Sequence, residues 1–265
     1  MRLLKAKRLI AGCAVGVVVA IASPSANHSW RNFHWARTSV TFTLKVGNNL
    51  DSGWTGYLDD AISSWNVSAV LDLTKVSGGT NSSCSPTLGQ IEVCNGSYGD
   101  NGWLGIASVW TSGPHIVQAT TRVNDTYFNT AQYNTPAWRR MVMCQEIAHD
   151  FGLDHQDETF NNANLGSCMD YTNDPDGGPG GFSPTDPSNE GPNPHDYDQL
   201  QKIYDHVDRS TSVGQGTSNP AAEHQIARGQ FGRLVRSTND GRTQLYLLEL
   251  GNGQQVWTHV IWADQ

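Results

Sequence analysis

The chain has 265 residues, of which 37% are hydrophobic and 16% are charged, and its formal net charge at pH 7 is −8. This length is enough for one well-buried core with a small appendage. A negative surface repels nucleic acid and anionic lipid, so neither is an expected partner.

The first 26 residues are typical of a signal peptide. A basic start precedes an apolar run from Leu9 to Ala22, which is too short to span a bilayer comfortably. Small residues then offer two cleavage sites, one ending at Ala22 and one at Ala26. A lipoprotein signal ending at Cys13 is the alternative, but the apolar core lies mostly after that cysteine. We therefore expect secretion, with no membrane attachment once residues 1–26 are removed.

Strand and helix patterns alternate through the next part of the chain, which predicts an α+β domain over residues 27–208. Helical spacing of apolar residues predicts a first helix ending near Trp65. A second helix is predicted from Thr135-Pro136 and a third from Asn193-Pro194, because Thr and Asn are good N-caps and Pro suits the first helical position. The predicted strands are Ser39–Val46, Val70–Val76, Gly89–Cys94, Trp103–Trp110 and His115–Val123.

The C-terminal part has a different composition. Residues 209–229 are predicted to be a linker, and residues 230–265 a small β meander. Its strands are predicted near Phe231–Ser237, Thr243–Leu250 and Gln255–Trp262, joined at Asp240-Gly241 and Asn252-Gly253, which are strong hairpin signals. Such a small meander is marginal alone, so we expect it to dock on the main domain or on a partner.

Four cysteines follow the signal peptide, and an even number in an exported chain predicts two disulfides. Proximity favours a bridge between Cys84 and Cys94. That choice leaves Cys144 to pair with Cys168, and two separate buried thiols are the alternative for this second pair.

A metal-binding motif begins at position 145 and reads Gln-Glu-Ile-Ala-His-Asp-Phe-Gly-Leu-Asp-His. It matches the long zinc-protease pattern His-Glu-x-x-His-x-x-Gly-x-x-His everywhere except at the first position. Gln145 and His149 lie four residues apart on a helix and so point to one spot. Gly152 permits the left-handed turn that brings His155 back to the same spot. The motif predicts one catalytic zinc held by these three side chains, with Glu146 as the general base.

This motif, together with Met169 after it, resembles the metzincin metallopeptidases, which include the matrixins, astacins and serralysins. The resemblance implies a twisted, mixed five-stranded sheet with two main helices, the active-site helix, a turn that places Met169 beneath the metal, and a C-terminal helix. It also implies that Tyr171 helps to stabilise the transition state. Substrate would lie extended along an edge strand within Trp103–Trp110, and the loop from Thr172 to Asn193 would wall a specificity pocket.

The resemblance predicts a secreted, monomeric endopeptidase that acts on a peptide or protein substrate. Gln145 departs from the family pattern, because a neutral amide oxygen is a weaker zinc ligand than an imidazole. Asp157 or Glu158 could take its place in the ligand set. The second hypothesis is therefore a catalytically inactive, metzincin-like binding protein.

The remaining histidines and loop carboxylates are predicted to have no metal role. The loop after the motif has no ordered calcium-ligand spacing, so its polar residues are expected to be solvated turn residues, with calcium as the alternative. These loop residues are Asn173, Asp174, Asp176 and Asp186. The histidines expected to be ordinary surface or core residues are His115, His195, His206, His224 and His259.

Overall fold

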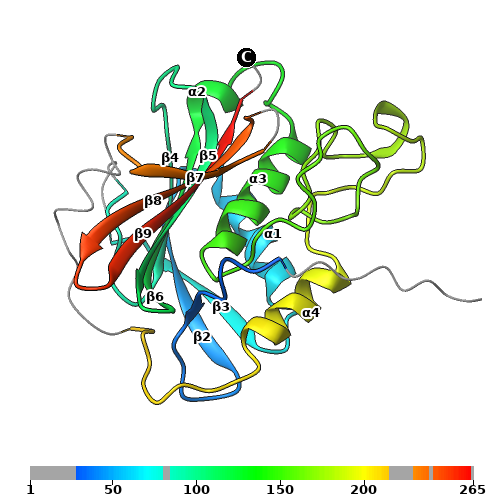
Figure 1. Ribbon diagram of the computed structural model, residues 1–265. Coiled ribbons are helices and arrows are strands. Elements are labelled where there is room, and N and C mark those ends of the chain that lie inside the picture. Colours follow the sequence, from blue (N-terminus) through cyan, green and yellow to red (C-terminus); the bar gives the residue numbers. More distant parts are fainter. Residues whose placement is uncertain (1–27, 80–83, 215–228, 239–240, 264–265) are drawn as a thin grey trace, which may run out of the picture.

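The computed structural model describes residues 28–79, 84–214, 229–238 and 241–263 (Figure 1). The predicted signal peptide and most of the predicted linker lie outside these ranges. No helix within the described ranges combines the length and the apolar character that crossing a bilayer requires.

A mixed sheet forms the centre of the molecule, and its strands run in the order β3-β2-β4-β6-β5-β9-β8-β7, with β1 paired to β6 (Figure 1). The neighbours from β3 to β6 are parallel, whereas β5, β9, β8 and β7 are joined antiparallel. The α+β class predicted from the sequence is confirmed. The strands are β1 His34–Trp35, β2 Phe42–Asn49, β3 Leu71–Ser77, β4 Ile91–Gly96, β5 Trp103–Ser112, β6 His115–Asn124, β7 Arg233–Ser237, β8 Thr243–Gly251 and β9 Gln254–Trp262.

Helices α3 and α4 begin at the predicted caps, Thr135 and Asn193. The Thr135 side chain accepts a hydrogen bond from the Trp138 backbone N–H at 3.2 Å. Asn193 and Asp196 form a reciprocal capping box at the start of α4. Helices α1 and α3 lie side by side against the sheet (Figure 1). The helices are α1 Thr55–Trp65, α2 Asp125–Phe128, α3 Pro136–His149 and α4 Pro194–Ile203, with a 3₁₀ turn at Gly178–Gly180.

The C-terminal meander continues the central sheet. Strand β9 pairs antiparallel with β5, and Ala107 lies opposite His259. This pairing corrects two predictions. The described part of the chain has a nine-stranded sheet rather than a five-stranded one. Trp103–Trp110 also has no free edge, because β5 is bonded to β6 on one side and to β9 on the other.

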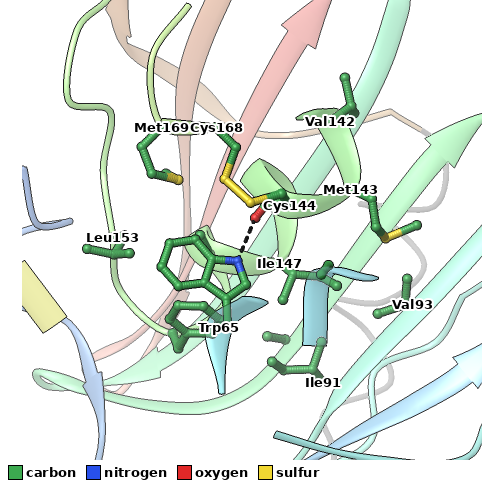
Figure 2. Close-up of a cluster of buried hydrophobic side chains, with 14 of the residues drawn as sticks. Trp65, Ile91, Val93, Val142, Met143, Cys144, Ile147, Leu153, Cys168 and Met169 are labelled. Carbon is green, nitrogen blue, oxygen red and sulfur yellow. Dashed lines mark hydrogen bonds between the residues drawn. A yellow bond between two sulfur atoms is a disulfide. The ribbon is translucent and has the colours of Figure 1, made fainter. Parts of the chain in front are cut away.

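Two disulfides link the predicted pairs, Cys84 to Cys94 and Cys144 to Cys168. The second bridge joins α3 to the turn that carries Met169, and it lies beside the buried Trp65 ring (Figure 2). The Trp65 indole N–H donates to the backbone oxygen of Cys144 at 3.1 Å. The bridge and this hydrogen bond together fix the position of the motif helix in the core.

Removing the second bridge should destabilise the fold. We expect a Cys144→Ser/Cys168→Ser variant to lose about 3 kcal/mol of unfolding free energy, because the bridge constrains the unfolded chain. Urea denaturation under non-reducing conditions measures this loss. Cys84→Ser/Cys94→Ser should lose somewhat less, since its partners are 10 rather than 24 residues apart. An unchanged midpoint in the first variant would contradict the expectation.

Candidate metal centre

Three histidine rings from distant parts of the chain meet at the end of α3. His149 is the last residue of α3, His155 follows the turn at Gly152, and His259 lies in β9. One ring nitrogen of each histidine lies within 4.8 Å of the other two, and all three side chains are buried. The structure therefore brings together two predicted ligands and adds a histidine that the sequence analysis treated as ordinary.

The turn between the first two histidines requires glycine. Gly152 has a φ of 102°, which favours glycine. A Cβ at this position would lie 2.1 Å from the backbone oxygen of Phe33. The motif glycine therefore serves both the turn and the close packing of the N-terminal segment.

Hydrogen bonds orient the two motif histidines. The Nδ1 atom of His149 lies 2.8 Å from the backbone oxygen of Leu153. The Nδ1 atom of His155 lies 3.3 Å from the Glu158 carboxylate and 3.3 Å from that of Asp154. Because a carbonyl and ionised carboxylates can only accept, both Nδ1 atoms carry the hydrogen. The Nε2 atoms then present lone pairs to the cluster, as zinc ligands do.

The separations in this cluster suit a zinc ion. The Nε2 atoms of His149 and His155 are 3.0 Å apart. The Tyr171 hydroxyl lies 2.8 Å from Nε2 of His155 and 2.8 Å from Nε2 of His259. Ligands at about 2.0–2.1 Å from a tetrahedral zinc are separated by about 3.3 Å. Two imidazole lone pairs that face each other repel unless a cation lies between them, so these residues fit the metal.

Burial keeps the histidines in the form that binds a metal. It lowers the pKa of His149 well below its usual value, and the electrostatic interaction with the nearby His155 ring lowers that pKa further. The pKa of His259 is also lowered well below its usual value, first by burial and then by His149. Both rings are therefore neutral at pH 7.

Gln145 lies in the core beside this cluster. Its side chain is fully buried, and its amide N–H donates to the backbone oxygen of Cys168 at 2.8 Å. Its amide oxygen has no hydrogen-bond partner among the described residues. A buried acceptor without a partner costs stability unless something binds it, so this oxygen is available to a cation.

The two carboxylates considered as substitutes for Gln145 are engaged elsewhere. Asp157 accepts from the Thr159 backbone N–H at 2.8 Å and from the Asn162 amide at 2.6 Å. Glu158 lies on the Nδ1 side of His155 and forms an ion pair with Arg236 at 3.2 Å. Both therefore support neighbouring groups and do not replace the amide.

Glu146 has no hydrogen-bond partner for either carboxylate oxygen among the described residues, although it is fully buried. Its Oε2 lies 3.6 Å from Nδ1 of His259. Burial, and after it the charge of Asp150, raise the pKa of Glu146 well above its usual value. Gly105 in β5 makes room for this side chain, because a Cβ there would lie 2.9 Å from Glu146 Oε1. The carboxylate is thus positioned to accept a proton beside the histidines.

The centre is closed to solvent in this structure. Glu146 and His149 are 0% exposed, and Tyr171 and His259 are 1% exposed. Strand β9 covers one side, and the Trp30 ring stacks on His149 with 4.9 Å between centroids. A polypeptide cannot reach these groups while β9 is paired with β5.

The sequence offered one signal for His259. Trp257, His259 and Ile261 alternate along β9, and both apolar neighbours belong to the main core. The intervening Val256 and Val260 belong to a separate cluster on the other face. A histidine on the core-facing side of a strand needs a partner, and that requirement was the available clue.

Two further predictions concern Met169 and the polar residues of the loop that follows it. Met169 is fully buried, and its backbone N–H donates to the Ser167 hydroxyl at 2.9 Å. The calcium alternative has no support, because the groups of metal-ligating side chains in the described residues include neither Asp174 nor Asp186. The Asn173 side chain instead accepts from Arg242 at 2.6 Å.

The similarity of this chain to known proteins is low. No family model matches the sequence, and no curated protein matches it. Among solved structures, the chain is similar to high choriolytic enzyme 1, a hatching enzyme zinc-protease from Oryzias latipes (medaka fish). The identity is 12%, the TM-score is 0.36, and the match covers 66% of this chain and 95% of that chain. A similarity at this TM-score carries no functional argument.

Proposed function

We propose that this protein is a secreted zinc-dependent metalloendopeptidase that its own C-terminal meander keeps latent. The supporting observation is the pair of Nε2 atoms of His149 and His155, 3.0 Å apart, together with a buried Glu146 carboxylate that accepts no hydrogen bond from the described residues. Two disulfides suit an oxidising compartment, which agrees with export.

Each residue has a role in this proposal. His149, His155 and the Gln145 amide oxygen would hold zinc, with His259 as a further ligand in the latent form. When bound, zinc acts as a Lewis acid and makes a water molecule nucleophilic at neutral pH. Glu146 would take the proton of that water and pass it to the leaving amine.

Tyr171 and β5 would position the substrate. Once His259 leaves, the Tyr171 hydroxyl can donate to the carbonyl oxygen of the substrate as negative charge develops there. An extended peptide would pair with β5 in place of β9, and the loop from Thr172 to Asn193 would wall the pocket beside the cut. In this proposal, residues 27–208 are the catalytic unit and residues 230–265 are its plug.

The burial of the centre favours a second candidate function. If the cluster never opens to substrate, a bound metal would only stabilise the fold. The chain would then be an inactive binding protein. The two candidates differ in one property, which is turnover of a peptide by the zinc-loaded chain after the meander is displaced.

Metal removal tests the proposal. We expect a His259→Ala variant to hydrolyse casein, to lose this activity with 1,10-phenanthroline and to regain it with added zinc. His149→Ala in the same background should lose the activity and the zinc of this centre. His195→Ala serves as a matched control and should keep both. Zinc bound at this centre without any hydrolysis would favour the inactive binding protein.

A further inference from the structure

A second group of metal-ligating side chains lies away from the centre described above. His34 is in β1, His115 begins β6, and His206 and Asp208 follow the end of α4. In Figure 1, β1, the start of β6 and the chain after α4 lie together at the lower end of the sheet. We infer that these four side chains form a second zinc site, whose role is to fasten three segments of the fold together.

Four of the six separations between the proposed ligand atoms are close to those of a tetrahedral site, and His34, His115 and Asp208 each offer a ligand atom within 4.8 Å of the other two. Nε2 of His34 lies 3.1 Å from Nε2 of His206 and 3.5 Å from Oδ1 of Asp208. The same Asp208 oxygen lies 3.1 Å from Nε2 of His115 and 3.8 Å from Nε2 of His206. These values bracket the separation of about 3.3 Å between ligands of a tetrahedral zinc. Three imidazoles and one carboxylate are a ligand set that zinc accepts.

The hydrogen bonds around the cluster leave lone pairs directed at its centre. Nδ1 of His34 lies 2.8 Å from the backbone oxygen of Asn32, which can only accept. Nδ1 of His206 lies 3.3 Å from the Asp205 carboxylate. The His34 ring therefore carries hydrogen on Nδ1, and when His206 does the same, two Nε2 lone pairs face each other at 3.1 Å. A cation between them removes this repulsion, and the acceptors at Nδ1 are the outer partners that metal-bound histidines have.

Asp208 is held in place by the backbone of the segment that follows β1. Its Oδ2 accepts from the Arg37 backbone N–H at 3.0 Å, and its own backbone N–H donates to the Arg37 oxygen at 2.7 Å. Oδ1 is thereby left for the cluster. The Asp208 side chain is 12% exposed and that of His206 is 46% exposed, so solvent reaches the site from the His206 side. An ion can enter there without opening the core.

Four protein ligands leave no open position for a substrate, which is typical of structural zinc. In the sheet, β1 is only two residues long and pairs with β6 through His34 and His115. So short a strand gains little from its own hydrogen bonds. A metal bound by His34, His115 and Asp208 would tie β1 to β6 and to the chain after α4.

A third group of metal-ligating side chains consists of His28, His195 and Asp196, and hydrogen bonds account for part of it. Nδ1 of His195 lies 3.1 Å from Nε2 of His28, so one ring can donate to the other. Asp196 already accepts at Oδ2 from the Ser167 hydroxyl at 2.7 Å and from the Asn193 backbone N–H at 2.7 Å. Nε2 of His195 and Oδ1 of Asp196 have no hydrogen-bond partner among the described residues, so His195→Ala tests whether this group also holds an ion.

Metal stoichiometry of the full chain tests the second site. The chain is stripped with a chelator and titrated with zinc, and bound metal is counted by elemental analysis. We expect the unchanged chain to bind two equivalents of zinc tightly, and His206→Ala and Asp208→Asn to bind one each. Each variant should bind the second equivalent at least about 100-fold more weakly than the unchanged chain does. His206 is half exposed, so its replacement leaves the core intact. His195→Ala should keep two equivalents.

Two further measurements separate this site from the first. His149→Ala should also bind one equivalent, and His149→Ala/His206→Ala should bind none. Cobalt in place of zinc should give tetrahedral absorption bands in His149→Ala that disappear in the double variant. Two equivalents retained in both His206→Ala and Asp208→Asn would overturn the second site. So would a single equivalent in the unchanged chain that only His149→Ala removes.

Discussion

Replacement of His259 with alanine is expected to raise casein hydrolysis by the full-length chain about 100-fold. The His259 ring lies 4.3 Å from that of His149 and 4.5 Å from that of His155, between centroids. Its replacement removes the zinc ligand that β9 would supply, and with it one interaction that holds β9 against β5. A rise of this size corresponds to a closed form that outnumbers the open form by about 99 to 1.

A reducible disulfide between β5 and β9 tests whether the meander itself blocks the activity. Ser108 in β5 faces Thr258 in β9, and their side-chain oxygens are 3.0 Å apart. Opposed residues of antiparallel strands have Cα atoms about 4.5–5.5 Å apart, which suits a disulfide. We expect Ser108→Cys/Thr258→Cys in the His259→Ala background to be inactive when oxidised and active after mild reduction. His259→Ala alone, treated with the same reductant, is the control.

Two outcomes would contradict latency. If the oxidised, locked variant hydrolyses casein as fast as the reduced one, displacement of β9 is not required. If His259→Ala loses one zinc equivalent and shows no activity, His259 is a permanent ligand and the meander is part of the working site.

Replacement of Glu146 with glutamine is expected to lower kcat by about 10²- to 10⁴-fold, which is the usual contribution of a general base. The change keeps the shape of the side chain, so the space left by Gly105 stays filled and the zinc content should not change. The rate is measured in the His259→Ala background. The part of the activity loss at acid pH that comes from protonation of Glu146, whose pKa burial raises, should disappear as well, because a glutamine has no proton to gain.

Glu158→Gln is the matched control for this variant. Its carboxylate lies 3.3 Å from Nδ1 of His155, on the side of the ring away from the proposed ion, and it also binds Arg236. We expect its effect on kcat to stay within about 10-fold, as for an outer partner of a ligand. Equal losses in the two variants would mean that Glu146 acts only through the structure of the site.

Local features of the fold were predictable because short-range chemistry determines them. Thr135 and Asn193 cap helices because their side chains reach backbone N–H groups within the next turn. Gly152 has a positive φ where the motif must turn. Spacing along one helix and one turn was also enough to bring His149 and His155 together.

Long-range pairing was not predictable from these local patterns. Alternation within β5 and β9 determines which side chains share a face, but it does not determine which strands are neighbours. Local patterns therefore predict Trp103–Trp110 as an edge, and they predict neither the nine-stranded sheet nor the position of His259 beside His149 and His155. His34 and His115 are brought together in the same way, by a short parallel pairing between β1 and β6.

The most direct test of the central claim is a crystal structure of the zinc-loaded chain with anomalous data at the zinc edge. We predict a peak about 2.0–2.1 Å from Nε2 of both His149 and His155, with the Gln145 oxygen directed at it. No peak between these two rings at saturating zinc, or rings that turn away from each other, would contradict the assignment of a metallopeptidase.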